Sequence, residues 1–452
     1  MSNQAATRLA EFTVGTQLGD LSPQALLSAK QLALKTFAGM LAGSSMDAGR
    51  KVAEHVRTSP DGAQAGVVGH GFKASLWKST FANAFFAHQS ELEDDRLTSG
   101  TSWDITTYPM LVPLTELYGL SGAEMIVASA VGLEVMARTC QFFPQGHLGL
   151  SVCPPSIGPA ALASRAMGLD IGKTSAAFGL AMSGVPISYV NFGTDAHYFE
   201  TSIQTLHGLL AAQGASIGLS SNPDLERYLT SLLGTERVDS ALITDKLGDE
   251  WQFTEIWVKK YPCCLYTHRY LDGFLELTQA NGFKEDDIAN VKIHVAAGAM
   301  EVCNRPAPET VGDLQFSFQH LISVAAVDGE VDYRHIQQQC VADPVLKKAR
   351  QKVEVVVRPD WSARLPVETP CLIEVSLRDG RVLTSNRQYP TGTLDEPLSL
   401  EFVQGLFKKF VGANLPTSDR EYAADAIGQL ERLGRDDVRE LIAILTRTKV
   451  KQ

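Results

Sequence analysis

The stretch IGPAALASRAMGLDIGKTSAAFGLAMSG (residues 157–184) is made largely of alanine, glycine and serine, with apolar residues between them. Side chains this small let the backbones of neighbouring helices approach closely, and helices of this kind are also seen in membranes. A membrane span needs about 18 or more consecutive apolar residues, and charges interrupt this stretch and every other candidate. We therefore expect closely packed helices of a soluble α-domain here.

Two segments within the first 140 residues share a helical pattern. SPQALLSAKQLALKTFAGMLAGS (22–44) has Ser22 as its expected N-cap and Pro23 at the first helical position. LSGAEMIVASAVGLEVMART (120–139) has Ser121 as its expected cap. Apolar residues recur in both at a spacing of three to four, which is typical of a helix with one buried face. The sequence predicts helix almost throughout, to about residue 265.

The pattern changes after about residue 285. VKIHV (291–295) and VEVVV (353–357) are rich in β-branched residues, and LIEVSLRDGRVLTS (372–385) predicts a hairpin with a glycine in its turn. FSFQHLISVAAVDGEV (316–331) predicts a helix with Gly329 as its C-cap, and the tail is helical again. We expect a mainly α protein. A large all-helical domain spans residues 1–275 and 396–452, and a smaller inserted α+β domain spans residues 276–395.

Composition limits the partners and the compartment. The chain has 452 residues and a formal net charge of -11, which argues against nucleic acid and anionic membranes as partners. Seven cysteines are scattered without any C-x-x-C spacing, so neither disulfides nor structural zinc is indicated. The segment MSNQAATRLAEF (1–12) has no signal-peptide pattern. We expect a cytoplasmic protein.

Six segments, in order along the chain, together resemble the MmgE/PrpD family. They are NAFFAHQSELEDD (83–95), GAEMIVASAVGLEVMAR (122–138), CPPSIGPAALASRAMGLD (153–170), KKYPCCLYTH (259–268), FSFQHLISVAAVDGEV (316–331) and DEPLSLEFVQGLFKKF (395–410). The resemblance implies a helical domain built from both chain ends, a homodimer, and activity without a metal or an organic cofactor. It also implies a small di- or tricarboxylate substrate, which loses a proton next to a carboxylate or loses a neighbouring group.

The acidic run HQSELEDD (88–95) aligns with a family segment that reads H-x-x-D-x-D-D-T. His88 matches its histidine, Glu91 its first aspartate and Asp94 one of its aspartate pair. If the run is helical, Glu91 shares a face with Asp94 and Asp95. Repulsion between carboxylates is a usual way to keep one of them protonated for catalysis. We expect Glu91 and Asp94 to be catalytic, and the alternative is a solvated helix end.

Two family positions are altered in this chain. Where the family has a His-Pro-Gly step, this chain reads Thr107-Tyr108-Pro109, and we expect Tyr108 to offer its hydroxyl to the substrate. Cys153, in VCPPS, stands where the family often has histidine. A thiol is a poor base unless a nearby cation lowers its pKa. Cys153 is therefore either a substrate contact or a small buried side chain.

A third family motif, T-K-P-L-H-x-G, normally supplies a lysine and a histidine. Counting back from His207-Gly208, this chain has His197 at the lysine position and Glu200 at the histidine position. We expect His197 to be catalytic and Glu200 to contact the substrate. Exchanging two cationic groups for an imidazole and a carboxylate argues against a plain trianionic substrate.

The smaller domain and the segment before it supply further candidates. KKYPCCLYTH keeps the family frame, in which Lys260 is expected to bind a substrate carboxylate and His268 to act as acid or base, with Arg269 adding to binding. The alternative is that Lys259 and Lys260 form a solvated strip. His320, in FSFQH, stands where the decarboxylases have a substrate-contacting tyrosine. We expect His320 to be catalytic, and the alternative is a structural histidine.

These residues predict a cofactor-independent lyase or isomerase, diverged from the standard dehydratases and decarboxylases. It would remove a proton next to a carboxylate of a small substrate. Elimination and isomerisation both remain open. The alternative from another class is a catalytically inactive dimeric scaffold or binding member of the family. Because the altered positions carry ionisable residues rather than alanine or leucine, the sequence favours an enzyme.

Overall fold

A computed structural model describes residues 4–59, 61–96, 101–142, 150–152, 156–184, 187–188, 194–222, 224–236, 238–364 and 370–448. The chain divides into two compact units. Unit 1 comprises Met1–Val190, Asp195–Ile256 and Ser399–Gln452, and unit 2 comprises Asn191–Thr194 and Trp257–Leu398. The protein is mainly α, which confirms the predicted fold class.

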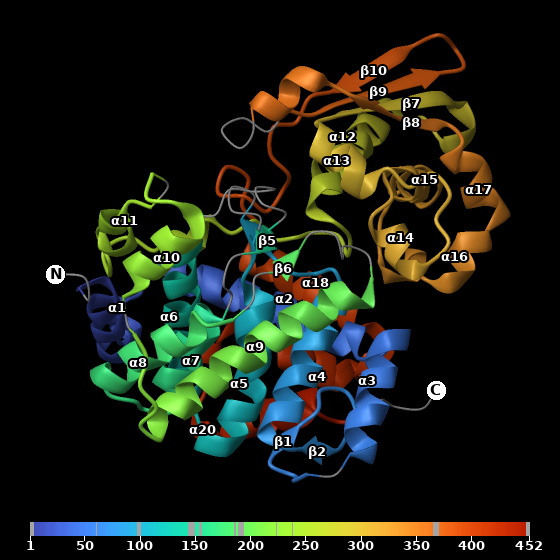
Figure 1. The fold of residues 1–452 in the computed structure, drawn as a ribbon. Coiled ribbons are helices and arrows are strands. Elements are labelled where there is room, and N and C mark those ends of the chain that lie inside the picture. Colours follow the sequence, from blue (N-terminus) through green and yellow to red (C-terminus); the bar gives the residue numbers. More distant parts are fainter. Residues whose placement is uncertain are drawn as a thin grey trace. The chain divides into compact units, whose positions relative to one another are not determined.

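Unit 1 is built of helices (Figure 1). They are α1 (Gln4–Gly15), α2 (Pro23–Gly43), α3 (Asp47–Thr58), α4 (Leu76–Gln89), α5 (Asp104–Tyr118), α6 (Gly122–Cys140), α7 (Ile157–Ala166), α8 (Ile171–Ala181), α9 (Asp195–Ser216), α10 (Leu225–Leu233), α11 (Ser240–Thr244), α18 (Leu400–Val411), α19 (Thr417–Gly428) and α20 (Arg435–Leu445). Three short strand pairs connect them: β1 (Ala65–Gly66) with β2 (Lys73–Ala74), β3 (Asp95–Arg96) with β4 (Thr101–Ser102), and β5 (Leu150–Val152) with β6 (Ile187–Ser188).

The predicted helix starts are confirmed by their caps. The side chain of Ser22 accepts a hydrogen bond from the backbone N–H of Ala25, and Pro23 occupies the first turn of α2. At the start of α6, Ser121 and Glu124 form a capping box, in which each side chain accepts from the other residue's backbone N–H. Both caps satisfy backbone donors that a helix start otherwise leaves open.

Small residues let the central helices of unit 1 touch backbone to backbone. A Cβ atom added to Gly158 of α7 would lie 2.8 Å from the carbonyl oxygen of Gly132 in α6. One added to Gly208 of α9 would lie 2.6 Å from the carbonyl oxygen of Ser156. Such approaches leave no room for any larger side chain. The predicted close helix packing of residues 157–184 is therefore confirmed.

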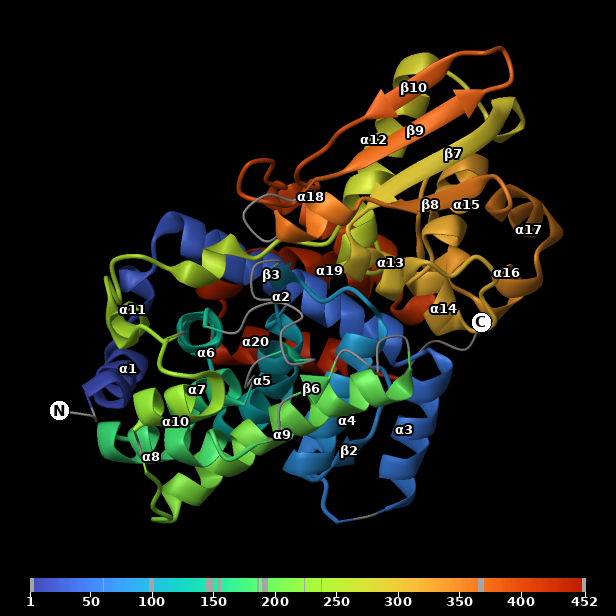
Figure 2. The same cartoon turned by 45° about the horizontal axis from the view of Figure 1, so that its top comes forward.

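Two long-range packings shape unit 1. The C-terminal helices α18 and α19 pack against α2, so both chain ends contribute to the same unit (Figure 2). Helix α9 packs against α4, α7 and α8, and both views show it beside α4. The packing of α9 on α4 brings the end of one helix next to the start of the other.

Unit 2 contains a four-stranded sheet with helices against it. The strands are β7 (Ile288–Val295), β8 (Val353–Val357), β9 (Leu372–Leu377) and β10 (Val382–Ser385), in the order β10-β9-β7-β8. Strands β7 and β8 are parallel and the other pairs are antiparallel, which includes the predicted hairpin. The helices are α12 (Leu265–Asn281), α13 (Ala297–Cys303), α14 (Val311–Gln315), α15 (Phe318–Asp328), α16 (Gln338–Ala342) and α17 (Pro344–Arg350).

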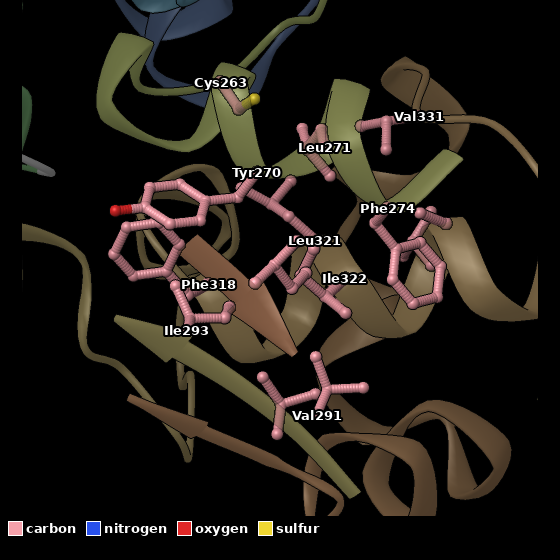
Figure 3. Close-up of a cluster of buried hydrophobic side chains, with 14 of the residues drawn as sticks. Cys263, Tyr270, Leu271, Phe274, Val291, Ile293, Phe318, Leu321, Ile322 and Val331 are labelled. Carbon is pink, nitrogen blue, oxygen red and sulfur yellow. The ribbon is translucent and has the colours of Figure 1, made fainter. Parts of the chain in front are cut away.

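The core of unit 2 lies between its sheet and helices α12 and α15 (Figure 3). Val291 and Ile293 of β7 belong to one buried cluster with Leu271 and Phe274 of α12. Along β9 buried and half-buried residues alternate, as expected of a sheet with one covered face. Helix α15 ends at Gly329, which has a φ of 71° and is its predicted C-cap.

Two further findings concern the part of the chain that the structure describes. None of its helices is both long enough and apolar enough to cross a membrane. Its six cysteines, which exclude Cys153, are buried and form no disulfide bond with one another.

Candidate active site

The acidic run after α4 is buried, and it is not helical. Helix α4 ends at Gln89, and Glu91 has a φ of 54°, in the left-handed region that side chains rarely adopt. Because this run is not helical, Glu91 and Asp94 do not share a helical face. Glu91 is only 1% exposed and Asp94 is fully buried, so the solvated helix end is excluded as well. Arg96, behind them, pairs with Glu255.

Groups from two other helices hold Asp94 in place. The ammonium group of Lys35 in α2 lies 3.9 Å from Oδ1 of Asp94 and donates a hydrogen bond to the carbonyl oxygen of Leu92 at 3.3 Å. The backbone N–H of Asp94 donates to Oδ1 of Asp104, the first residue of α5, at 3.0 Å. Because Lys35 is itself buried, its charge offsets part of the cost of burying the carboxylate.

Asp104 is a buried acid whose pKa lies near neutrality. Burial raises the pKa of its carboxyl to about 7, and the negative charges of Glu93 and Asp95 act in the same direction. The N–H of Asp94 and the hydroxyl of Thr36, 2.7 Å from Oδ2, oppose this rise without cancelling it. A carboxyl that is partly protonated at neutral pH has the property expected of a proton carrier.

Two histidines meet where α4 and α9 pack together. His88, in the last turn of α4, and His197, in the first turn of α9, are both buried, and their ring centroids are 4.1 Å apart. The hydroxyl of Thr201 lies 2.7 Å from Nδ1 of His88 and donates to the carbonyl oxygen of His197 at 3.3 Å. Thr201 therefore links the ring of His88 to the backbone of His197.

Glu91 completes a compact group with the two histidines. One imidazole nitrogen each from His88 and His197 and one carboxylate oxygen of Glu91 all lie within 4.8 Å of one another. Such a group is suited to accepting and donating protons, and two imidazoles with one carboxylate can also hold a transition-metal ion. Glu200, the other predicted residue of α9, lies one turn beyond His197 and is half-buried.

The hydroxyl of Tyr108 contacts another helix. It lies in the middle of α5, fully buried, and its hydroxyl donates to the carbonyl oxygen of Ala29 in α2 at 2.7 Å. Burial raises its pKa well above the usual range. The hydroxyl joins two helices in this structure, and a substrate contact by Tyr108 stays a prediction. The predicted contact Cys153 lies outside the described residues.

Lys260, in unit 2, has an internal counter-ion. Its ammonium group lies 3.2 Å from Oδ1 of Asp272, which also accepts the hydroxyl of Tyr261 at 2.7 Å. Burial alone would raise the pKa of Asp272, but the charge of Lys260 and hydrogen bonds from Tyr261 and the Thr391 N–H lower it. Because Lys260 is paired within the protein and Lys259 is buried, the two lysines do not form the solvated strip that was the alternative. Carboxylate binding by Lys260 stays a prediction.

His268 and Arg269 are buried in the first turns of α12. Nε2 of His268 lies 3.2 Å from the carbonyl oxygen of Cys263, and its ring stands edge-on to that of Tyr261. The guanidinium of Arg269 lies 3.5 Å from the carbonyl oxygen of Gln388. These contacts tie α12 to its neighbouring loops. The predicted acid/base role of His268 and the substrate-binding role of Arg269 stay predictions.

His320 is held by contacts inside unit 2, and its predicted catalytic role stays a prediction. It is fully buried in the first turn of α15, where its Nε2 donates to the carbonyl oxygen of His335 at 2.8 Å. Its Nδ1 accepts from Arg350 at 3.1 Å. Burial lowers the pKa of His320 to about 3. With both ring nitrogens engaged and the ring neutral, His320 joins α15 to the segments around Arg350 and His335.

Sequence reasoning missed part of this site. Lys35 lies within an apolar helical pattern, where a single lysine gives no sign that it faces a buried carboxylate. Asp104 resembles an ordinary acid in a helix's first turn. Thr201 follows His197 by one helical turn, and this i, i+4 spacing was the available signal. His88 was matched to the family motif but was not singled out as a site residue.

Known proteins match this chain over most of its length. The MmgE/PrpD N-terminal domain matches residues 7–227 and the MmgE/PrpD C-terminal domain matches residues 261–432. Cis-aconitate decarboxylase of Mus musculus is 23% identical over 438 residues, covering 93% of this chain and 89% of the relative. That of Homo sapiens is 22% identical over 445 residues, covering 93% and 90%. The cis-aconitate decarboxylase-like protein oryM of Aspergillus oryzae is 21% identical over 467 residues, covering 94% of each. The chain belongs to the MmgE/PrpD family.

Proposed function

We propose that this chain is a lyase or isomerase that acts on a small carboxylate and begins by removing a proton from the carbon next to a carboxylate. Membership of the MmgE/PrpD family supports this class of reaction, and the relatives from Mus musculus and Homo sapiens are named cis-aconitate decarboxylases. At 23% and 22% identity these relatives do not fix the substrate of this chain. The arguments for the mechanism come from its own site.

The observation that carries the proposal is the buried group of His88, Glu91 and His197. Removing a proton from carbon requires a base within hydrogen-bond reach of the substrate, and an acid to return a proton to the carbon or the leaving group. Two imidazoles and a carboxylate within 4.8 Å of one another provide both functions in one place. Because the three come from the ends of two different helices, their meeting depends on the tertiary fold.

The surrounding charges suit the same chemistry. Removal of the proton leaves an enolate-like anion, which a nearby cation or hydrogen-bond donor stabilises. Lys35 is a buried cation beside Asp94, and Asp104, with its pKa near 7, is hydrogen-bonded to the Asp94 N–H. We assign proton transfer to Glu91 and Asp94 with His197. Lys35 balances the charge of Asp94, and Asp104 positions it through its backbone N–H.

Burial of these groups argues against an inactive scaffold. Taking a carboxylate or an ammonium group out of water costs several kcal/mol even after partial compensation by partners. Glu91, Glu93, Asp94 and Lys35 are all at most 4% exposed. A scaffold would gain stability from apolar residues at these positions. Retention of so many buried ionisable groups in one place is typical of an active site.

Solvent exchange tests the proposal without knowledge of the final product. The protein is incubated in D₂O with a panel of small mono-, di- and tricarboxylates, and proton NMR follows the C–H next to each carboxylate. We expect one compound to exchange or react with the wild type. Asp94→Asn and His197→Ala should slow this reaction by about 10²- to 10⁴-fold. His207→Ala, a half-buried histidine further along α9, is the matched control and should react at the wild-type rate.

Two outcomes would contradict the proposal. Equal rates in the wild type, D94N and H197A would remove these residues from the mechanism. If no compound reacts and none raises the melting temperature, the inactive scaffold would be favoured.

A further inference from the structure

A cavity of about 540 Å³ lies in unit 1, between the β1–β2 hairpin, the end of α5 and helix α20. We call it the α20 cavity, after the helix that supplies Arg435, Arg439 and Ile442 to its lining. Its volume is in the range of small-molecule pockets, roughly 300 to 1,000 Å³. None of the described residues that line it belongs to the candidate active site. Asp104 of that site and Glu116 of the cavity lie about 18 Å apart along α5, so the two places are separate.

Backbone contacts join the three walls of the α20 cavity. The N–H of Gly71, beside β2, donates a hydrogen bond to the carbonyl oxygen of Thr446 at 2.8 Å, just after α20 ends. The N–H of Gly66 in β1 donates to the carboxylate of Glu116 in α5. A Cβ atom added to Gly66 would lie 2.5 Å from Cγ2 of Thr446. The walls are therefore held together by backbone hydrogen bonds and close packing rather than by flexible side chains.

The described lining carries more positive than negative charge. Its basic residues are Lys73, Arg435, Arg439 and Arg447, and its acidic residue is Glu116. The ammonium group of Lys73 lies 3.0 Å from Oε1 of Glu116, which leaves the arginines in excess within the lining. The whole chain has a formal net charge of -11, so this group of cations is opposite in sign to the protein as a whole. A cavity with such a lining attracts anions.

Arg439 and Arg435 have counter-ions outside the lining, and both ion pairs are exposed. Arg439 lies 2.6 Å from Asp436, and their side chains are 77% and 91% exposed. Arg435 lies 3.0 Å from Glu124 in a pair that is about half-exposed. Exposed ion pairs contribute little stability, so a guanidinium can turn to a bound anion at small cost. The parallel N–H donors of a guanidinium match the two oxygens of a carboxylate.

Apolar side chains line the cavity beside the arginines. They are Phe72, Leu120, Ile442 and Ala443. Ile442 and Ala443 follow Arg439 by three and four positions in α20, so the three residues lie on one face of the helix. A bound molecule therefore meets cations and apolar surface in the same cavity, and it gains affinity from burying apolar surface of its own.

We propose that the α20 cavity binds a small organic anion with one carboxylate and an apolar body. The carboxylate would pair with Arg439 and Arg435, and the apolar body would cover Phe72, Leu120 and Ile442. This proposal goes beyond the proposed function and does not depend on it. Because the cavity and Asp104 are at opposite ends of α5, such a ligand would not occupy the place of the substrate.

Titration of the full chain with octanoate, a straight-chain carboxylate, is the test, with proton NMR of the ligand as the readout. The wild type should bind octanoate saturably. Acetate lacks the apolar body and octanol lacks the charge, so each should bind at least about tenfold more weakly.

Two variants locate the binding. Arg439→Gln removes a charged hydrogen-bond donor and should weaken octanoate binding by about tenfold. Ala443→Phe fills the cavity from an exposed position of α20 and should weaken binding by at least about tenfold. Arg50→Gln is the matched control, because Arg50 also pairs with an aspartate three residues before it and is not part of the described lining. It should bind octanoate as the wild type does.

Failure of the wild type to bind octanoate, or equal binding by the wild type and either folded cavity variant, would overturn the proposal. Circular dichroism checks folding, and Arg439→Gln, at an exposed side chain, keeps the test decisive if Ala443→Phe does not fold. His197→Ala separates this proposal from the proposed function, because it should bind octanoate like the wild type. If H197A loses octanoate while R439Q and A443F keep it, the probe occupies the candidate active site. The cavity proposal then falls and the proposed function stands.

Discussion

Replacing Asp104 by asparagine should remove a pH dependence from the stability of the protein. Oδ1 of Asp104 accepts the Asp94 N–H, and Oδ2 lies 2.7 Å from the hydroxyl of Thr36. That hydroxyl has one proton, and it also lies 2.8 Å from the carbonyl oxygen of Leu32. A protonated Asp104 donates to Thr36, which then donates to Leu32, so every group is satisfied. The NH₂ group of an asparagine can donate in the same way.

The magnitude follows from the raised pKa of Asp104. Its pKa is about 7 in the folded protein, against 3.8 for the unperturbed group. The folded state holds the proton of Asp104 more tightly than the unfolded state does. The contribution of Asp104 to the unfolding free energy is therefore complete below pH 3.8 and is lost as the pH rises through about 7. The shift of about 3 pKa units corresponds to about 4 kcal/mol in total. Between pH 5 and pH 8 the loss is about 2 to 3 kcal/mol.

Urea unfolding at pH values from 5 to 8 measures this effect, with fluorescence as the readout. The unfolding free energy of the wild type should fall relative to that of Asp104→Asn by about 2 to 3 kcal/mol over this range. Asp249→Asn changes an exposed carboxyl in the same unit and should follow the wild type. Other titrating groups affect all three proteins alike, so they cancel in the differences. Parallel curves for the wild type and D104N would refute the raised pKa and, with it, the view of Asp104 as a proton carrier.

Two further predictions concern His320 and Tyr108, whose side chains make hydrogen bonds within the protein. Because the folded pKa of His320 is about 3 against 6.5 for the free group, its contribution to stability is complete above pH 6.5 and is lost as the pH falls. The wild type should lose about 2 kcal/mol more than His320→Gln between pH 7 and pH 5 in urea titrations, and equal losses would contradict the neutral ring. Tyr108→Phe removes the hydroxyl that donates to the carbonyl oxygen of Ala29, which keeps its place inside helix α2, so we expect about 0.5 to 1.5 kcal/mol of destabilisation with an unchanged deuterium-exchange rate. A slowed rate in Y108F would favour Tyr108 as a substrate contact.

Local sequence signals predicted most of the fold. Ser22, Ser121 and Gly329 mark helix ends through hydrogen bonds or backbone angles that depend on a few neighbouring residues. Helix α5 gives no such signal, because it contains Pro109 and Pro113, which normally interrupt a helix. Its burial among other helices of unit 1 holds it in place, and packing of that kind cannot be predicted from a local pattern.

The site was predictable to a smaller extent, because its residues meet through long-range packing. Glu91 and His197 were each singled out from the sequence, but their closeness depends on α9 lying against α4. The position of His320 in the family frame suggested a catalytic role. Its hydrogen bonds to Arg350 and His335 come from residues distant in the sequence, so the family frame alone could not predict them.

The charge of the site limits which substrates it can bind. Glu91, Asp94 and Asp104 lie in one buried region in which Lys35 is the described cation beside Asp94. A ligand with three carboxylates would bring further negative charge to this region, and charge without a counter-ion is costly where water is excluded. Replacement of the family lysine by His197 strengthens this argument, because an imidazole carries at most a partial share of the charge that a lysine carries at neutral pH. On this argument, the substrate that we propose for this chain carries fewer than three carboxylates.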